Sequence, residues 1–186
     1  MKEDVMSQSW SSKRKKLEDE FLCKALRGRV QYFFTIYHGA PDEAGRFAVR
    51  VDGKELWQAH AYNEGTYDRI ANEIKGEQGI PNRQWDGKQI VHDRENREAE
   101  DLAVQIANGR GIASTWDVLG AIEEYLNMDI QDALHSDNAI IRMFAILDRR
   151  VGKRTLLSVQ GEYSNSEEWL KEFYELRIQA EGLCNT

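Results

Sequence analysis

One segment, residues 136–156, restricts the folds open to this chain more than any other. It starts with Ser-Asp-Asn, residues that favour a helix start, and continues as an almost wholly apolar run. The spacing predicts a helix over 138–150 that Gly152 ends. The predicted core side of this helix carries four apolar residues: Ile140, Ile141, Phe144 and Leu147. A face this apolar has to be covered, so we expect other elements to pack around this helix.

The first third of the chain combines a helix with strand patterns. An amphipathic helix is expected from Ser11 to about Leu26, with Gly28 as its end. Alternating or β-branched runs predict strands over 30–37, 46–51 and 54–59. Asp52-Gly53 separates the last two runs. An Asp-Gly pair between alternating runs favours a type I′ turn, in which both central residues take positive φ.

The rest of the chain has helical periodicity. Helices are expected over 66–74, over 94–107 with Leu102, Ala103 and Ile106 inward, after Ser114 or Thr115, and over 130–134. Residues 164–167 resemble a capping box for a last helix. The predicted fold class is therefore α+β: an N-terminal helix and a three-stranded antiparallel sheet, followed by a mostly helical C-terminal two-thirds. We expect a single domain over 1–186, within which lobes over 10–75 (α/β) and 93–183 (helical) share a core.

Composition narrows the class of protein. The 186 residues are 41% hydrophobic, and the net charge of −7 argues against a general nucleic-acid coat, which would be basic. No apolar run is long enough to span a bilayer, and the first residues do not form a secretory signal. Cys23 and Cys184 lie far apart with no metal-binding or redox spacing. We therefore expect a cytoplasmic protein with reduced thiols and no membrane contact.

Basic side chains cluster around the end of the apolar segment. The candidate binding residues are Arg142, Arg149, Arg150, Lys153 and Arg154, and residues 13–16 form a second cluster. On one continuous helix, Arg142, Arg149 and Lys153 would share a side. Arginine suits bidentate contact with carboxylates or phosphates, which favours an anion site. The alternative is structural: cations near a helix C-terminus offset its dipole and pair with Asp148 and neighbouring acids.

A second pattern resembles a nuclease site. Asp42 follows a proline, and Asp52 and Lys54 come ten and twelve residues later. Metal-dependent nucleases use such carboxylates to hold Mg²⁺ and such a lysine to orient water. The alternative is that both acidic residues belong to turns. The four histidines have no zinc-site spacing, and we expect neither a metal nor a cofactor.

Several stretches are similar to a family of small bacterial cytosolic proteins to which no activity is assigned. They are the Ser-Trp-Ser start of the first helix (residues 9–11), Val-Asp-Gly-Lys-Glu at 51–55, Ala-Ile-Leu-Asp-Arg-Arg-Val-Gly-Lys-Arg-Thr-Leu at 145–156, and the ending Trp-Leu-Lys-Glu-Phe-Tyr-Glu-Leu-Arg at 169–177. The resemblance implies a bacterial or phage origin and an intracellular protein. It implies no reaction.

The function expected from these observations is non-catalytic. We expect an intracellular binding protein that modulates or neutralises a macromolecular partner, in the manner of regulatory or immunity proteins. A protein partner is expected first, and nucleic acid second, through the local basic clusters. The alternative is an enzyme acting on nucleic acid or another phosphate substrate, with Asp42, Asp52 and Lys54 as its catalytic residues. The oligomeric state is left open.

Overall fold

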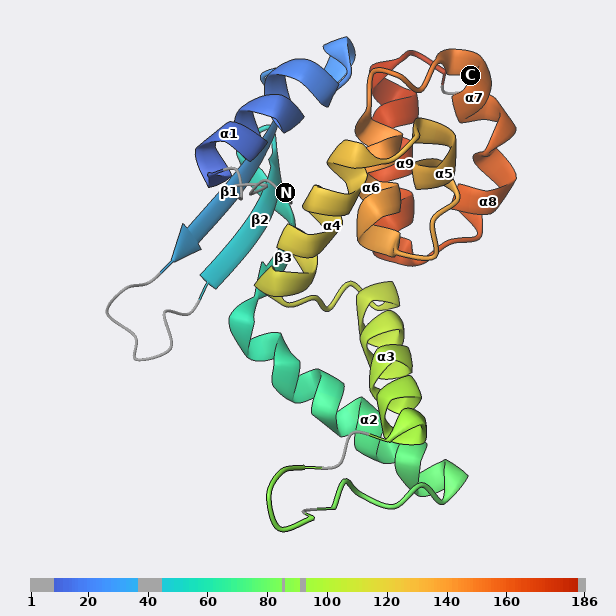
Figure 1. Cartoon of the computed structure of the whole chain (residues 1–186). Coiled ribbons are helices and arrows are strands. Elements are labelled where there is room, and N and C mark those ends of the chain that lie inside the picture. The colour runs from blue at the N-terminus through green and yellow to red at the C-terminus, as the bar shows by residue number, and fades with distance from the viewer. Residues whose placement is uncertain (1–8, 37–44, 85, 91–92, 184–186) are drawn as a thin grey trace, which may run out of the picture.

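The computed structural model describes residues 9–36, 45–84, 86–90 and 93–183. Within these ranges the chain forms an N-terminal helix, a three-stranded antiparallel sheet and then helices, which confirms the α+β class. The sheet and the later helices build one body, and a helical hairpin made of α2 (Glu64–Gln78) and α3 (Arg94–Gly109) extends away from it (Figure 1).

The N-terminal helix is shorter than predicted. Ser9 caps α1 (Trp10–Lys15), which passes into a π-helical turn over Lys16–Phe21, and a 3₁₀ turn follows at Lys24–Leu26. Between the two turns, Leu22 forms an isolated antiparallel bridge with Asp148, and the Cys23 amide donates to the Leu147 carbonyl at 2.9 Å. A continuous helix to Leu26 is therefore wrong, because this tertiary pairing needs extended backbone.

The sheet has the order β1-β2-β3, built from Val30–Ile36, Gly45–Val51 and Lys54–His60. Its inner face is apolar, as the alternation predicts, and contributes Tyr32, Phe47, Val49, Trp57 and Ala59 to the core. On the other face Arg50 lies over the Phe33 ring and pairs with Glu55, which also binds Arg46. Paired charges thus cover the side of the sheet that faces away from the core.

The predicted turn between β2 and β3 is confirmed. Asp52 and Gly53 have φ values of 51° and 80°, the pair of positive angles that a type I′ turn requires. Asp52 also accepts hydrogen bonds from the Arg29 guanidinium, at 3.0 and 2.8 Å.

We expect Gly53→Val to lower the free energy of unfolding by about 1–2 kcal/mol, since a β-branched residue resists positive φ. Denaturant unfolding would measure this change. The matched control is Gly76→Ala on α2, where φ is not positive and an added Cβ meets no atom within 4 Å. The free energy of unfolding of this control should rise by about 0.5–1 kcal/mol, because alanine is favoured over glycine inside a helix. Equal effects at the two sites would contradict the turn assignment.

The helical part is built around α6 (Ala139–Leu147). Every residue of this helix except Arg142 is buried. Five further helices lie in this part of the chain: α4 (Thr115–Asn127), α5 (Ile130–Leu134), α7 (Lys153–Ser158), α8 (Gln160–Ser164) and α9 (Glu168–Ala180). Helices α4, α5 and α9 pack directly on α6, so the most apolar segment of the sequence is the centre of the fold (Figure 1).

Helix boundaries confirm some predicted caps and correct others. Ser114 and Asp117 form a full capping box at the start of α4. The capping box predicted at 164–167 is wrong, because Glu167 precedes α9 without a side-chain cap and the Ser166 hydroxyl donates to the Tyr163 carbonyl. The helix predicted over 138–150 is also too long: α6 ends at Leu147, and Asp148 has extended backbone.

The α2–α3 hairpin has a small core of its own. It consists of Ile70, Ala71 and Ile74 from α2 and Ala99, Ala103 and Ala107 from α3. Small alanines spaced four apart let the two helices approach closely. Leu102, which was predicted to point inward, is 39% exposed. The hairpin is longer than the pattern indicated, because α2 continues beyond Ile74 to Gln78 and ends at Gly79 with φ of 67°.

Two tryptophans fasten the base of the hairpin to the body. The Trp57 indole N–H donates to the Gly111 carbonyl at 2.9 Å, and that of Trp169 donates to the Gly109 carbonyl at 3.0 Å. The two indoles stack with centroids 5.1 Å apart. Gly111 has φ of 78°, and a Cβ there would lie 3.1 Å from the Trp169 ring. A β-strand and α9 therefore both hold the segment that leaves α3.

Two structural observations concern membrane-spanning helices and thiols. In the described ranges, no helix combines the length and apolar character needed to cross a bilayer. Cys23 is a free, buried thiol, and burial raises its pKa. Cys184 lies outside the described residues.

Candidate functional site

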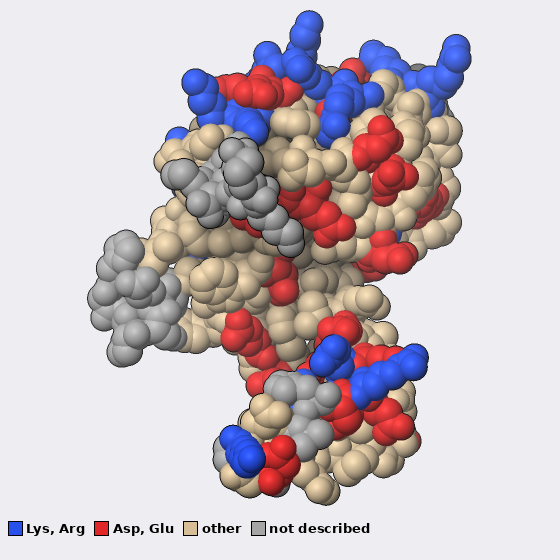
Figure 2. All heavy atoms as spheres, viewed as in Figure 1, with Lys and Arg blue, Asp and Glu red and all other residues tan. Residues whose placement is uncertain are grey.

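Basic side chains gather where α6 passes into α7. Arg149, Arg150, Lys153 and Arg154 are all exposed there, and we call these four residues the basic end. Figure 2 shows Lys and Arg side chains along the upper edge of the molecule, above α1 and α7. The segment crosses the N-terminal turns, because the Arg149 amide donates to the Phe21 carbonyl at 2.7 Å.

Arg150 is bound internally despite its partial exposure. Its guanidinium lies 2.7 Å from a carboxylate oxygen of Asp148, whose side chain is fully buried, and its Nε donates to the same oxygen at 2.9 Å. The guanidinium also lies over the Phe21 ring, 4.6 Å from the centroid. The Tyr125 hydroxyl donates to Asp148 as well. Arg150 therefore neutralises a buried anion.

The electrostatics agree with this geometry. Burial raises the pKa of Tyr125, and the charge of Asp148 raises it further, so the phenol stays protonated and keeps donating. Burial acts to lower the pKa of Arg150, but the hydrogen bond and charge of Asp148 outweigh burial and raise it. Both shifts keep the Tyr125 hydroxyl and the Arg150 guanidinium as donors to Asp148.

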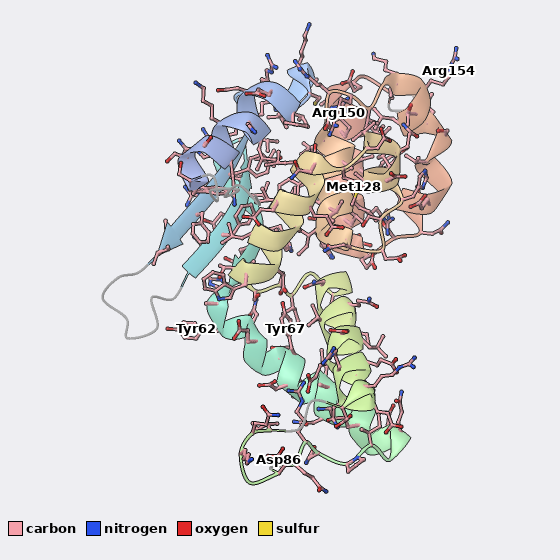
Figure 3. All side chains as sticks on the ribbon, viewed as in Figure 1. Tyr62, Tyr67, Asp86, Met128, Arg150 and Arg154 are labelled. Atoms are coloured by element: carbon pink, nitrogen blue, oxygen red, sulfur yellow. The ribbon has the colours of Figure 1, made fainter. Side chains whose placement is uncertain are left out.

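The other three cations differ in how they are held. Lys153 donates to the backbone carbonyl of Glu181 at 2.7 Å, which ties α7 to the end of α9. Within the described chain, no hydrogen bond or ion pair engages the side chains of Arg149 or Arg154. Arg154 projects away from the body at the end of the molecule (Figure 3). Arg149 and Arg154 are thus the two residues of the basic end whose side chains bind no other described residue.

Arg142 does not join the basic end. Its side chain is 15% exposed, lies 3.4 Å from Glu162 and packs over the Tyr163 ring. The shared helix side predicted for Arg142, Arg149 and Lys153 is wrong, since α6 stops at Leu147 before the last two. In the N-terminal cluster, Lys13 is buried against Glu123, while Lys15 is exposed.

Two of the three nuclease-like residues belong to the β2–β3 hairpin in the described part of the chain. Asp52 sits in the hairpin turn, and the hydrogen bond from Arg29 lowers the pKa of its carboxyl. Lys54 is exposed at the start of β3, and Asp42 lies outside the described residues. Among the residues that the structure describes, no group of three or more His, Cys, Asp or Glu could hold a metal ion.

One residue of this surface was missed in the sequence. Leu157 is 50% exposed on α7, three residues after Arg154 and therefore one turn away on the same side. Gly152 is predicted as a helix stop, but α6 already ends at Leu147 and Gly152 is the N-cap of α7. The Lys-Arg-Thr-Leu-Leu run after that glycine was the available signal for a second, short helix.

Comparison with known proteins places the chain in a family. The model of the SF0329 protein family matches residues 9–178. The chain belongs to this family. The matched region runs from the cap of α1 into α9, so the SF0329 match includes the sheet, the hairpin and the basic end. No curated protein matches the chain. No solved structure matches it either.

Family membership is consistent with the resemblance described above. The bacterial or phage origin and cytosolic location that the resemblance implied stay predictions.

Proposed function

We propose that this protein is a non-catalytic binding protein of the bacterial or phage cytosol. Its basic end would dock on an acidic surface of a protein partner and thereby modulate or neutralise that partner. The observation that carries this proposal is the contrast within one cluster: Arg150 and Lys153 have internal partners, whereas Arg149 and Arg154 are exposed without any in the described chain. Two arginines beyond the structural need are available for recognition.

The backbone that presents these arginines is held in place. The Arg150 amide donates to the Asp148 carboxylate at 2.7 Å, and the Val151 amide donates to the Asp148 carbonyl at 3.2 Å. The buried Arg177 guanidinium donates to the carbonyls of Leu147 and Val151 from beneath. A surface already ordered in the free protein pays less entropy on binding, which favours a recognition role.

Apolar exposure favours a protein partner over nucleic acid. Leu157 lies beside Arg154, and a half-exposed leucine among cations suits a protein interface, in which apolar contacts accompany charge pairs. Contact with a phosphate backbone needs no such residue. Single-stranded nucleic acid is bound through aromatic stacking. The two exposed aromatic residues of the described chain lie elsewhere: Tyr62 in the 3₁₀ turn Ala61–Asn63 that precedes α2, and Trp116 in the first turn of α4.

The double reversal Arg149→Glu, Arg154→Glu tests this function. We expect affinity for the partner, identified by co-purification and mass spectrometry, to fall at least about tenfold, since each reversal replaces attraction by repulsion. The melting temperature should stay within a few degrees, because neither side chain has an internal partner. Wild-type binding should weaken as salt rises, with screening over about 10 Å at 0.1 M.

The matched control is the double reversal Arg69→Glu, Arg97→Glu on the hairpin. It changes the net charge by the same amount, at two exposed positions that form no ion pair with any described residue. Equal loss of binding in the two double variants would contradict a local site. Retained binding in the basic-end variant would do the same. Salt-sensitive binding of duplex DNA or RNA that the basic-end reversal abolishes would instead favour a nucleic-acid partner.

A further inference from the structure

A cavity of about 320 Å³ opens between the hairpin and the start of α4, away from the basic end. Four carboxylates and two aromatic side chains from α2, α3 and α4 line it: Glu64, Asp68, Glu100, Asp117, Tyr67 and Trp116. Its volume is at the lower end of the roughly 300–1,000 Å³ typical of ligand pockets. In Figure 3, Tyr67 projects from α2 toward the segment that leads into α4.

Two of the four carboxylates in this cavity already bind side chains of the protein itself. Glu100 binds Lys75 at 2.9 Å and also Arg83. Asp117 accepts hydrogen bonds from the Tyr67 hydroxyl and from the Ser114 amide and hydroxyl. These bonds fix the base of the cavity, because they join α2 to the first turn of α4.

The other two carboxylates have no cationic partner among the described residues. Glu64 and Asp68 are exposed, stand four apart on α2 and have no ion pair with any described residue. Like charges at this spacing destabilise a helix. The dipole of α2 can favour Glu64, which is in its first turn, but the effect fades before Asp68. Helix stability therefore does not account for Asp68.

An aromatic wall stands beside these carboxylates. Trp116 lines the cavity and is 69% exposed, the largest exposed fraction among the described large apolar side chains. Trp116 is not a buried core residue, whereas Trp57 is one and Trp169 packs against the core. The face of an indole attracts cations more strongly than any other aromatic side chain.

We propose that this cavity binds the guanidinium group of an arginine side chain on a partner polypeptide. The guanidinium lies on the Trp116 face and donates to the Glu64 and Asp68 carboxylates. Arginine suits the site better than lysine, because its planar group stacks on an aromatic ring and donates to two carboxylates at once. This site is separate from the basic end and does not rest on the function proposed above.

The cavity at the far end of the hairpin shows what is specific here. It measures about 450 Å³ and is also lined by carboxylates, Glu95 and Glu98. None of the described residues that line it is aromatic, and Glu98 pairs with Arg94 at 2.6 Å. Acidic residues alone therefore do not distinguish the proposed site; the exposed indole beside two unpaired carboxylates does.

The test uses the intact protein and N-acetyl-L-arginine amide as the probe. The five tryptophan indole N–H signals are followed by NMR, and the Trp116 signal is identified from Trp116→Leu. We expect a saturable shift of the Trp116 signal with this probe and no shift with N-acetyl-L-citrulline amide, a neutral analogue of similar shape. Equal shifts with both compounds, or no saturable shift with the arginine probe, would overturn the proposal.

Variants separate the site from general charge effects. Asp68→Asn and Trp116→Leu should each lower the affinity for the arginine probe about three- to fivefold or more, as expected for a lost charge contact or cation–π contact. Binding to Trp116→Leu is followed through the Ser114 amide. The control Glu73→Gln removes an exposed, unpaired carboxylate of the same helix outside the cavity and should change nothing. Equal weakening in this control would overturn the assignment.

The source of the cation is tested with n-propylguanidinium, which carries a single positive charge like the blocked arginine but lacks its two amide groups. Binding of the blocked arginine at least as strong as that of n-propylguanidinium supports a side-chain ligand, because the peptide groups then do not interfere with binding. Binding of n-propylguanidinium alone would overturn the polypeptide assignment. An unchanged Trp57 indole signal in every variant confirms that the fold is intact.

Discussion

Replacing Arg150 with methionine should lower the free energy of unfolding by about 3 kcal/mol. The Asp148 carboxylate is buried, and Arg150 is the cation that compensates it, at 2.7 Å. Methionine keeps part of the packing over Phe21. The Asp148 carboxylate then has the Tyr125 hydroxyl and the backbone amide of residue 150 as its donors. A buried charge without its counter-charge is strongly destabilising. Chemical denaturation at neutral pH would measure the loss.

The neighbouring residue is the control for this prediction. Arg149→Met removes the same group from an exposed side chain with no internal partner among the described residues, and stability should stay within about 0.5 kcal/mol. Adding Asp148→Asn to Arg150→Met should restore part of the loss, since the buried charge is then gone. Equal effects of the two arginine replacements would contradict the internal role of Arg150. The same reasoning excludes Arg150 as a residue for testing partner binding.

Replacing Trp57 with alanine should lower the free energy of unfolding by about 4 kcal/mol. The side chain is buried on the inner face of the sheet, stacks on Trp169 and donates to the Gly111 carbonyl. Its removal leaves a cavity and an unpaired carbonyl at the base of the hairpin. Hydrogen exchange in the α2–α3 hairpin should also become faster, because one of the two anchors of that base is lost.

Trp116→Ala is the matched control, since Trp116 is exposed and is not a member of the buried core. Its stability should change by no more than about 0.5 kcal/mol. A similar loss in the two tryptophan variants would contradict the division between an anchoring and an exposed indole. An unchanged exchange rate in the hairpin of Trp57→Ala would contradict the anchor.

Local patterns predicted the elements whose causes are local. The type I′ turn at Asp52-Gly53 follows from residues that tolerate positive φ, and the flanking strands follow from side-chain alternation. The cap at Ser114 lies within one helical turn of Asp117, so the sequence alone contains both partners. The apolar run over 139–147 had to be buried, and it is the central helix. These results account for the correct α+β class.

Long-range pairing decided where the helices stop. Leu22 and Asp148 are far apart in the sequence, yet their bridge interrupts the N-terminal helix and coincides with the end of α6. Helical periodicity does not predict such a bridge, because extended backbone at these two positions is favoured only after the two segments have come together. The inward face of α3 was misjudged for a similar reason. The close approach of α2 selects the small Ala103 and leaves the larger Leu102 outside.

The sequence by itself determined that cations cluster near the end of the apolar helix, because composition and spacing are local properties. Only the tertiary structure decided what each cation does. Arg142 forms an ion pair with Glu162, and Arg150 forms one with a buried carboxylate. Lys153 donates a hydrogen bond to a carbonyl at the end of α9. Arg149 and Arg154 are exposed. The cavity beside Trp116 depends on tertiary structure in the same way, because three helices have to meet before its carboxylates and indole share one space. The energy of a charge depends on its burial and its partners, and the linear pattern specifies neither.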